Sequence, residues 1–349
     1  MGRGRAGSAH RRPDPGAGGG PDLTAGAGVA SAADEGGFRL RRAHLTLSPA
    51  VTPEPRHVPS ADGVEVAVHD FGGSGPPLLI VHATGFCGWA YHRVAAELVD
   101  RAHVLAPDLR GHGDSRTPPD ADLSWWRMAD DVLAVVDAVA GGGPVLAVGH
   151  SMGGCAVLLA ELVRPGSIAA AWLFEPIVMT EPPPPGTPNH MADAARRRRE
   201  FFESREAVYE RYRRRPPFSV CDPEALRDYV DHAFADTPDG RVVLKCRGET
   251  EARVFEGARV GVEFADRLGE IDIPVTVVAS GDGENPARIA PAVAAALPRA
   301  RLVRMDDLTH FGPFQDPARI AAAIAADLGL DRPAGGSGGA AGGGATGHG

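Results

Sequence analysis

The feature that most limits the folds open to this chain is an alternation of short apolar runs with amphipathic stretches of helix length. Strands are predicted at residues 64–69, 77–81, 102–106, 144–148, 168–174, 274–279 and 300–305. Helices are predicted at residues 89–99, 123–139, 152–163, 287–297 and 317–328. The run at residues 77–81 is apolar throughout, which is typical of a parallel strand buried on both faces. The alternation therefore predicts an α/β fold, with a mostly parallel sheet and helices on both of its faces.

The character of the chain changes at both ends and in the middle. Residues 1–43 and 333–349 contain mostly small or polar side chains, so we predict disordered tails that bury too little apolar area to fold. Residues 44–176 and 269–332 are predicted to form two parts of one core. Between them, residues 177–268 are predicted to form a helical cap or lid.

Within the predicted cap, arginine-rich helical stretches dominate the sequence. They lie at residues 194–203, 206–215 and 223–234, and the first strand signal comes only at residues 242–244. The four consecutive arginines at 196–199 are expected to face solvent, as such charged runs usually do.

Charge and composition exclude several classes of function. The net charge is −9, whereas nucleic-acid binding usually needs a basic face. No window approaches 18 consecutive apolar residues, and no apolar region of an export signal follows Arg11 and Arg12, so we expect a cytoplasmic protein without a membrane partner. The four cysteines are scattered, which makes a zinc site or a disulfide framework improbable.

The strongest chemical motif is Gly-His-Ser-Met-Gly at residues 149–153, with the pattern G-x-S-x-G. A predicted strand ends just before it and a predicted helix begins at it, which is the context that a nucleophilic serine needs. Glycines allow the sharp turn that lifts the Ser151 hydroxyl above the sheet, and the helix N-terminus directs backbone N–H groups towards a developing oxyanion. We therefore predict Ser151 as the nucleophile.

A serine hydroxyl needs a general base, and His310 is the histidine best placed to serve. It follows the last predicted strand by a short loop and precedes the last predicted helix. Catalytic groups of such sheets gather at the carboxyl ends of the strands. His82 lies in a tight turn, where a structural role is expected, and His150 should point away from the neighbouring serine.

Three further segments resemble the α/β-hydrolase family. Residues 82–86 (His-Ala-Thr-Gly-Phe) resemble its H-G-x-P-type oxyanion loop, residues 108–115 match its D-x-R-G-x-G-x-S loop, and residues 308–313 resemble its terminal histidine loop. The resemblance covers about residues 56–330 and implies an eight-stranded sheet. It also implies that the Met152 and Thr84 N–H groups form the oxyanion hole. Ala83 departs from the usual glycine, and residues 108–115 are expected to be a packing and turn element.

The acid that completes the triad is left open by the sequence. In the family it usually ends a G-x-x-D pattern, where this chain has Glu284, with Asp282 two residues earlier. An alternative position follows the strand after the nucleophile, which is Glu175 here. Residues 172–177 resemble the segment that carries the catalytic glutamate in haloalkane dehalogenases. We favour Glu175, with Glu284 as the first alternative.

These residues predict a serine hydrolase that cleaves a carboxylic ester or lactone of a small molecule through an acyl-enzyme. No cofactor or metal is implied. A serine at the turn argues against epoxide hydrolase and haloalkane dehalogenase chemistry. The resemblance implies that members of the family with those activities have an aspartate at this position. Two alternatives use the same triad, namely cofactor-free perhydrolase or haloperoxidase activity and C–C bond hydrolysis. A third is a small-molecule-binding protein of the same fold without catalysis. The oligomeric state is left open.

Overall fold

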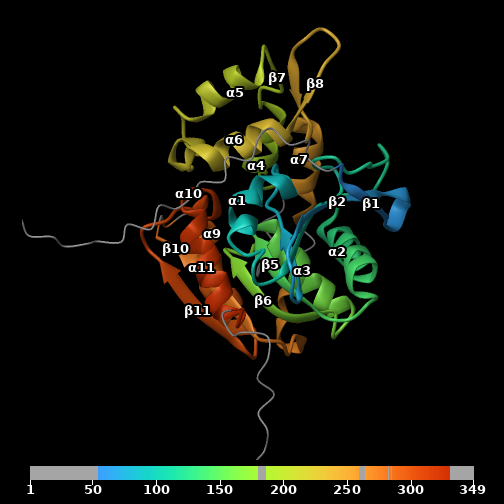
Figure 1. Ribbon diagram of the computed structural model, residues 1–349, viewed down its shortest axis with the longest axis vertical. Helices are drawn as coiled ribbons and strands as arrows, with labels where there is room; N and C mark the ends of the chain where they lie inside the picture. The colour runs from blue at the N-terminus through green and yellow to red at the C-terminus, as the bar shows by residue number, and fades with distance from the viewer. Residues whose placement is uncertain (1–53, 180–185, 259–263, 282, 284, 331–349) are drawn as a thin grey trace, which may run out of the picture. The chain divides into compact units, whose positions relative to one another are not determined.

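The computed structural model describes residues 54–179, 186–258, 264–281, 283 and 285–330 (Figure 1). The predicted tails, residues 1–43 and 333–349, lie outside the described residues, and so do Asp282 and Glu284.

The core is an eight-stranded sheet with the strand order β1-β2-β4-β3-β5-β6-β10-β11. Its strands are β1 (Arg56–Pro59), β2 (Glu65–Gly72), β3 (Pro77–Val81), β4 (His103–Asp108), β5 (Val145–His150), β6 (Ile168–Phe174), β10 (Val275–Ser280) and β11 (Ala300–Met305). The strands from β4 to β11 pair in parallel, whereas β2 pairs antiparallel with both β1 and β4. The predicted eight-stranded, mostly parallel sheet is confirmed.

Helices cover both faces of this sheet because successive side chains of a buried strand point to opposite sides. Leu79 and Val81 of β3 pack in a cluster with α2 (Trp125–Ala140), α3 (Met152–Val163) and α9 (Asn285–Ala296). Leu78 and Ile80 of the same strand pack in a second cluster with α1 (His92–Ala96) and α11 (Pro317–Asp327). None of the described helices is long and apolar enough to cross a membrane.

The helix predicted at residues 89–99 is shorter and less regular in the structure. Its first turn is a 3₁₀ helix, η2 (Gly88–Tyr91), and α1 follows only to Ala96. The Gly88 N–H donates to Asp108 Oδ1 at 2.6 Å, so a bond to β4 holds the start of this segment. This tight turn directs the Tyr91 side chain into the interior, and Tyr91 is only 2% exposed.

The segment between the two parts of the core contains strands as well as helices. Its helices are α4 (His190–Arg196), α5 (Arg205–Tyr212), the 3₁₀ turn η3 (Phe218–Val220), α6 (Pro223–His232) and α7 (Gly248–Gly257). A three-stranded antiparallel sheet accompanies them, in the order β7 (Phe201–Phe202), β9 (Val242–Leu244) and β8 (Phe234–Asp236). Figure 1 labels α4 to α7, β7 and β8 of this segment, whose colour runs from yellow-green to orange. We call residues 186–257 the cap.

Two predictions for the cap were wrong. The predicted helix at residues 194–203 ends at Arg196, and the chain then forms β7. The reason lies in the tertiary structure. Phe202 is buried in the core, and β7 pairs with β9, which follows about 40 residues later in the chain. The run of arginines is not uniformly solvated either, since the Arg198 side chain is only 19% exposed.

Candidate active site

Ser151 lies at a strained turn between β5 and α3. Its backbone has φ 56° and ψ −117°, a conformation that residues other than glycine rarely adopt and that costs roughly 1–3 kcal/mol. The flanking glycines allow this turn. A Cβ at Gly149 would lie 2.6 Å from the Gly154 Cα, and a Cβ at Gly153 would lie 2.2 Å from the Val81 carbonyl oxygen. The glycines in the sequence therefore allow the backbone to hold Ser151 at the end of the sheet.

Backbone bonds tie this turn to the end of the neighbouring strand β6. The Ser151 N–H donates to the Phe174 carbonyl at 3.0 Å, and the Ser151 carbonyl accepts from the Ile177 N–H at 3.2 Å. Glu175 lies between those two residues and also has a positive φ, of 46°. The predicted nucleophile and the favoured acid are thus carried by two adjacent turns.

The Glu175 carboxylate is fully buried and is held at both oxygens. Oε1 accepts from the Ser280 N–H at the end of β10, at 2.7 Å. Oε2 lies 2.6 Å from His310 Nδ1. Burying a carboxylate is costly unless it is paired and hydrogen-bonded, and this one is both. Ser280 has no counterpart in the sequence prediction, because its contribution is a backbone N–H that no residue type would reveal.

His310 lies in the loop between β11 and the short helix α10 (Gly312–Gln315). A neutral imidazole that donates from Nδ1 to Glu175 carries its lone pair on Nε2, so it can act as a base from that nitrogen. The His310 side chain is 20% exposed, whereas Glu175 is completely buried. The structure therefore brings His310 together with Glu175, whose turn is hydrogen-bonded to the Ser151 turn.

The two predicted oxyanion donors lie in segments that pack against each other. Thr84 Oγ1 lies 3.3 Å from the Met152 sulfur, and a Cβ at Gly153 would also clash with the His82 carbonyl oxygen. Among the described residues, neither the Thr84 nor the Met152 backbone N–H donates to a protein acceptor. Two unpaired amides beside a strained serine are suited to an oxyanion.

Two buried histidines fix the loop that carries Thr84. His82 Nδ1 lies 2.8 Å from the Ala83 carbonyl, and its Nε2 accepts from the Leu109 N–H at 2.9 Å. His112 Nε2 accepts from the Gly85 N–H at 3.1 Å. Burial lowers the pKa of His82 to about 3 and lowers that of His112 as well, so both rings stay neutral acceptors. The structural role expected for His82 is thus to accept a hydrogen bond from the Leu109 N–H.

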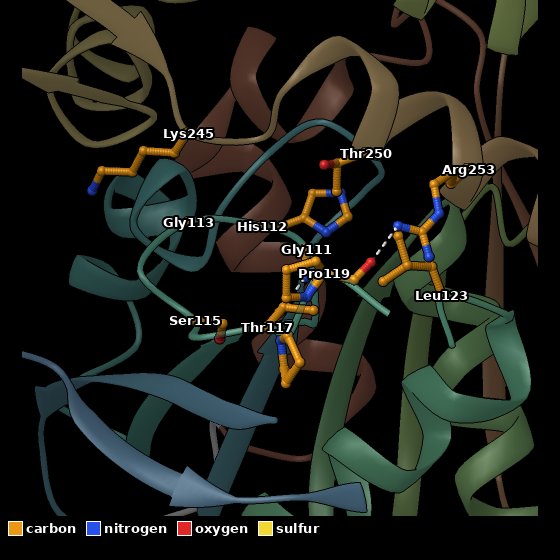
Figure 2. Close-up of a pocket in the computed structure, with 11 residues that line it drawn as sticks. Gly111, His112, Gly113, Ser115, Thr117, Pro119, Leu123, Lys245, Thr250 and Arg253 are labelled. Atoms are coloured by element: carbon orange, nitrogen blue, oxygen red, sulfur yellow. Dashed lines mark hydrogen bonds between the residues drawn. The ribbon is translucent and has the colours of Figure 1, made fainter. Parts of the chain in front are cut away.

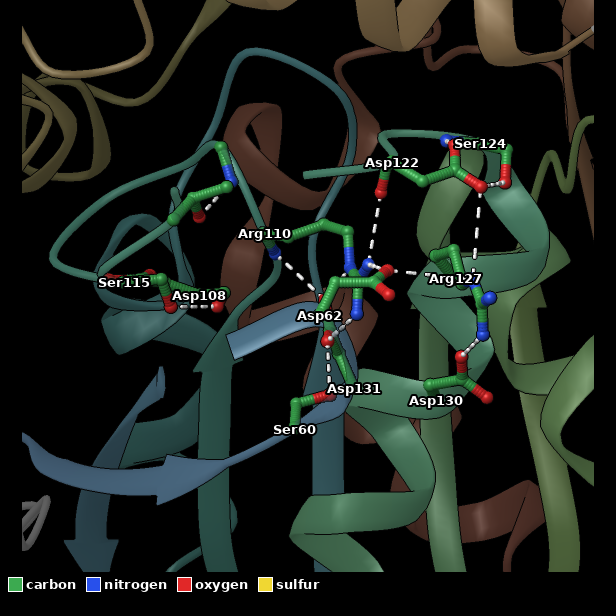
Figure 3. A network of polar contacts seen from close by, with 12 residues as sticks. Ser60, Asp62, Asp108, Arg110, Ser115, Asp122, Ser124, Arg127, Asp130 and Asp131 are labelled. Carbon is green, nitrogen blue, oxygen red and sulfur yellow. Dashed lines mark hydrogen bonds and ion pairs between the residues drawn. The ribbon is translucent and has the colours of Figure 1, made fainter. Parts of the chain in front are cut away.

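The loop at residues 108–115 is a rigid polar turn with no predicted catalytic residue (Figure 3). The Arg110 guanidinium is fully buried and donates to Asp131 from Nε at 2.9 Å and from Nη2 at 2.8 Å. Asp108 accepts from the Gly88 and Asp114 N–H groups. These bonds agree with the predicted role in packing and turn formation.

Among the described residues, one group of side chains has metal-ligand chemistry, namely His69, Asp108 and Asp114. His69 Nε2 lies 2.9 Å from Asp108 Oδ2, and Lys245 Nζ lies 2.6 Å from Asp114 Oδ1. Protein hydrogen-bond donors therefore already occupy these carboxylates, and an ammonium group stands where a cation would bind. We assign no metal to this group.

A cavity of about 190 Å³ lies between the loop at residues 111–119 and the cap residues Lys245, Thr250 and Arg253 (Figure 2). Its lining contains neither Ser151 nor His310. Both of its cationic side chains already have protein partners, because Lys245 contacts Asp114 and Arg253 donates to the Pro119 and Ala121 carbonyls. The side-chain chemistry, and not this cavity, marks the candidate active site.

Cap residues cover the loop that carries Thr84. The rings of Phe86, Phe218 and Phe311 contact one another at centroid distances of 5.4–6.0 Å, and they come from the Thr84 loop, the cap and the residue after His310. Above the same loop, Arg198 Nη1 donates to Glu251 Oε2 at 2.9 Å, and a Cβ at Gly85 would meet Glu251. Sequence patterns did not reveal these contacts, since they join distant segments.

Comparisons with known proteins agree with this architecture. The family model described as "Alpha/beta hydrolase family" matches residues 78–323. The lipase LipV of Mycobacterium tuberculosis is 30% identical over 179 residues, which are 51% of this chain and 65% of LipV. Mouse protein phosphatase methylesterase 1 is 40% identical over 91 residues, which are 25% of this chain and 24% of that protein. The chain thus spans less than two thirds of either relative.

Two solved structures show the same fold. E-2-(acetamidomethylene)succinate hydrolase superposes with a TM-score of 0.65 at 21% identity, covering 79% of this chain and 98% of that one. A thermophilic esterase from Thermogutta terrifontis superposes with a TM-score of 0.59 at 24% identity, with the same coverage. At these identities the likeness concerns the fold alone.

Proposed function

Because this chain belongs to the alpha/beta hydrolase family and is a hydrolase, we propose that it cleaves a carboxylic ester or lactone of a small molecule with Ser151 as its nucleophile. The observation that carries the proposal is the 2.6 Å contact between His310 Nδ1 and Glu175 Oε2 beside the strained Ser151 turn. An oriented imidazole next to a presented hydroxyl is the arrangement that nucleophilic acyl transfer needs.

In the proposed first step, the Ser151 hydroxyl proton passes to His310 Nε2 while Oγ forms a bond to the substrate carbonyl carbon. The carbonyl electron pair moves onto oxygen, and the Met152 and Thr84 N–H groups stabilise that oxyanion. Each such donor contributes roughly 10²- to 10³-fold in rate. When the oxyanion collapses, the bond to the leaving oxygen breaks and His310 gives it the proton. Water activated by the same histidine then releases the acid and regenerates Ser151.

Glu175 has an electrostatic role in this scheme. It orients the imidazole through Nδ1 and stabilises the imidazolium that forms when His310 takes the proton. The Ser280 N–H, at 2.7 Å from Oε1, fixes the carboxylate in place without competing for Oε2.

The surroundings of His310 and Thr84 support an ester with an apolar group. Phe86, Phe218 and Phe311 form an aromatic wall beside these residues. Aromatic side chains bury apolar substrate groups well and leave orientation to a few polar groups. The names of the two relatives, a lipase and a methylesterase, point to ester bonds as well.

The test is labelling with a fluorophosphonate, followed by mass spectrometry to locate the adduct. We expect one adduct on Ser151, none in Ser151→Ala, and labelling at least 100-fold slower in His310→Ala. Ser74→Ala is the matched control, since it removes an exposed hydroxyl between β2 and β3. A panel of p-nitrophenyl esters and lactones then measures kcat/KM. A folded wild-type protein that forms no adduct and cleaves no member of the panel would contradict the proposal and favour a binding protein of this fold.

A further inference from the structure

A chain of hydrogen bonds joins the three loops that meet at Ser151. The Ala83 N–H donates to Tyr91 Oη at 3.1 Å. Tyr91 Oη lies 2.7 Å from His150 Nδ1, and His150 Nε2 lies 2.9 Å from the His310 carbonyl oxygen. The chain therefore begins in the Thr84 loop, passes through the residue before the nucleophile, and ends on the backbone of His310.

The two ends of this chain fix the direction of every proton in it. A backbone N–H can only donate, so Tyr91 Oη is an acceptor towards Ala83. A backbone carbonyl can only accept, so His150 carries its hydrogen on Nε2. His150 Nδ1 is then left as an acceptor, and the Tyr91 hydroxyl donates to it. One tautomer of a neutral His150 satisfies all three bonds.

We propose that Tyr91 and His150 are positioning residues, which hold the Thr84 loop and the His310 loop at a fixed distance from the Ser151 turn. The proposal rests on the function proposed above, because it assigns to these loops an oxyanion donor and a general base. Neither residue has to touch substrate in this role.

Burial and packing suit both residues to such a role. Each is 2% exposed, and the His150 ring packs edge-on against Phe174 at 5.6 Å. Phe314 contacts both rings, at 4.8 Å from Tyr91 and 5.9 Å from His150. Side chains in such surroundings have few alternative rotamers, so the bonds they make hold backbone segments in place.

The chain also requires His150 to remain neutral while His310 gains a proton. A proton on His150 Nδ1 would leave the Tyr91 hydroxyl hydrogen without an acceptor. It would also put two like charges on rings whose centroids are 4.8 Å apart. Burial and the nearby His310 both lower the pKa of His150 well below its usual range. Burial raises the pKa of the Tyr91 hydroxyl, which therefore remains a donor.

His310 is thus fixed at two points of different kinds. Glu175 orients its ring through Nδ1, and His150 holds its backbone carbonyl. Loss of the second contact would let the loop move while the Glu175 bond persists. A displacement of about 1 Å at a reacting group can cost roughly 100-fold in rate.

The experiment compares Tyr91→Phe, His150→Phe and His150→Gln. For Tyr91→Phe and His150→Phe we expect kcat to fall roughly 10- to 100-fold with KM changed less than about threefold, since the chain orders loops and does not contact substrate. His150→Gln can still offer an amide N–H to the His310 carbonyl, so it should recover at least part of the loss seen in His150→Phe. Tyr209→Phe is the control, because it removes a hydroxyl from the cap, outside the hydrogen-bonded chain. The Tyr209 ring lies under Arg227.

A double variant distinguishes a hydrogen-bonded chain through Tyr91 and His150 from two independent packing effects at these residues. If the bonds act in series, the double variant Tyr91→Phe/His150→Phe should lose no more rate than the worse single variant. Fluorophosphonate labelling of Ser151 should slow in the same order as kcat. Circular dichroism below the melting temperature confirms that each variant is folded during the assay.

Nitrogen NMR of labelled histidine provides a readout that does not depend on turnover. We expect His150 in the wild type to be neutral with its hydrogen on Nε2, and its Nδ1 shift to move in Tyr91→Phe. A hydrogen on Nδ1, or unchanged kcat and labelling in folded Tyr91→Phe and His150→Phe, would overturn the inference alone. A wild-type protein without a Ser151 adduct would instead overturn the proposed function on which the inference rests.

Discussion

His310 Nδ1 lies 2.6 Å from Glu175 Oε2, although 135 residues separate the two side chains along the sequence. The other Glu175 oxygen accepts from the Ser280 N–H, so the carboxylate is fixed between the ends of β6 and β10. The residue predicted as base and the acid favoured from sequence therefore form an oriented pair in which the acid is fully buried, and its importance can be tested directly.

Glu175→Gln should lower kcat/KM by roughly 10³- to 10⁴-fold with little change in fold. The amide can still accept from Ser280, but its NH₂ group would then face His310 Nδ1 and favour the wrong tautomer. Steady-state kinetics on the best ester measures the loss. The exposed cap variant Glu249→Gln, which only disturbs a surface pair with Arg196, is the matched control. A larger loss in Glu284→Gln or Asp282→Asn than in Glu175→Gln would move the role of the acid to that residue.

Stability should fall as the pH drops from 7 to 5, because buried histidines must take up protons. Burial lowers the pKa of His82 to about 3, from 6.5 in an exposed chain. Between these values the unfolded chain binds a proton that the folded protein does not. The stabilisation is therefore complete above pH 6.5 and is lost as the pH falls towards 3, by about 1 kcal/mol per pH unit for each such group.

Urea unfolding at several pH values between 5 and 7 measures this slope. His82→Gln should make the slope shallower whatever its effect on stability at pH 7, because one titrating group has been removed. His190→Gln removes an exposed histidine at the start of α4 and should leave the slope unchanged. Equal slopes in the wild type and His82→Gln would show that His82 is not held neutral.

Arg198→Met should destabilise the protein by about 3 kcal/mol, because it leaves the Glu251 carboxylate buried without its partner. The double variant Arg198→Met/Glu251→Gln should recover part of that loss, since no unpaired charge remains. Arg213→Met, which removes an exposed pair with Glu210, should cost less than about 0.5 kcal/mol. Denaturant titration measures all three. The single variant Glu251→Gln completes the cycle, and a loss in the double variant equal to the sum of the two single losses would argue against a coupled pair.

Gly153→Ala should cost about 3 kcal/mol or more and abolish labelling of Ser151. A methyl group there would lie 2.2 Å from the Val81 carbonyl, so α3 must move away from β3 and carry the nucleophile turn with it. Gly269→Ala makes the same chemical change in the 3₁₀ turn η5 (Leu268–Glu270), where nothing lies within 4 Å, and should be tolerated. Thermal unfolding and fluorophosphonate labelling compare the two, and similar behaviour would refute the clash.

The sequence by itself determined the features that depend on neighbouring residues. Apolar runs of strand length between amphipathic stretches determined the mostly parallel sheet, because such strands are stable only when helices cover both faces. Gly149 and Gly153 around Ser151 determined a sharp turn between a strand and a helix, since bulkier residues would clash with adjacent backbone. These constraints act within a few residues and are readable from the chain.

Tertiary structure alone decided which distant groups meet. Glu175 faces His310 because β6, β10 and β11 are adjacent in the sheet, an order that no local pattern specifies. Strand β7 has two residues and exists only through its pairing with β9, so its segment was predicted as helix. Arg198 is only 19% exposed because the cap folds over Gly85 and brings Glu251 and Tyr229 to it. In each case, the energy comes from contacts between segments whose separation along the chain gives no sign of their proximity.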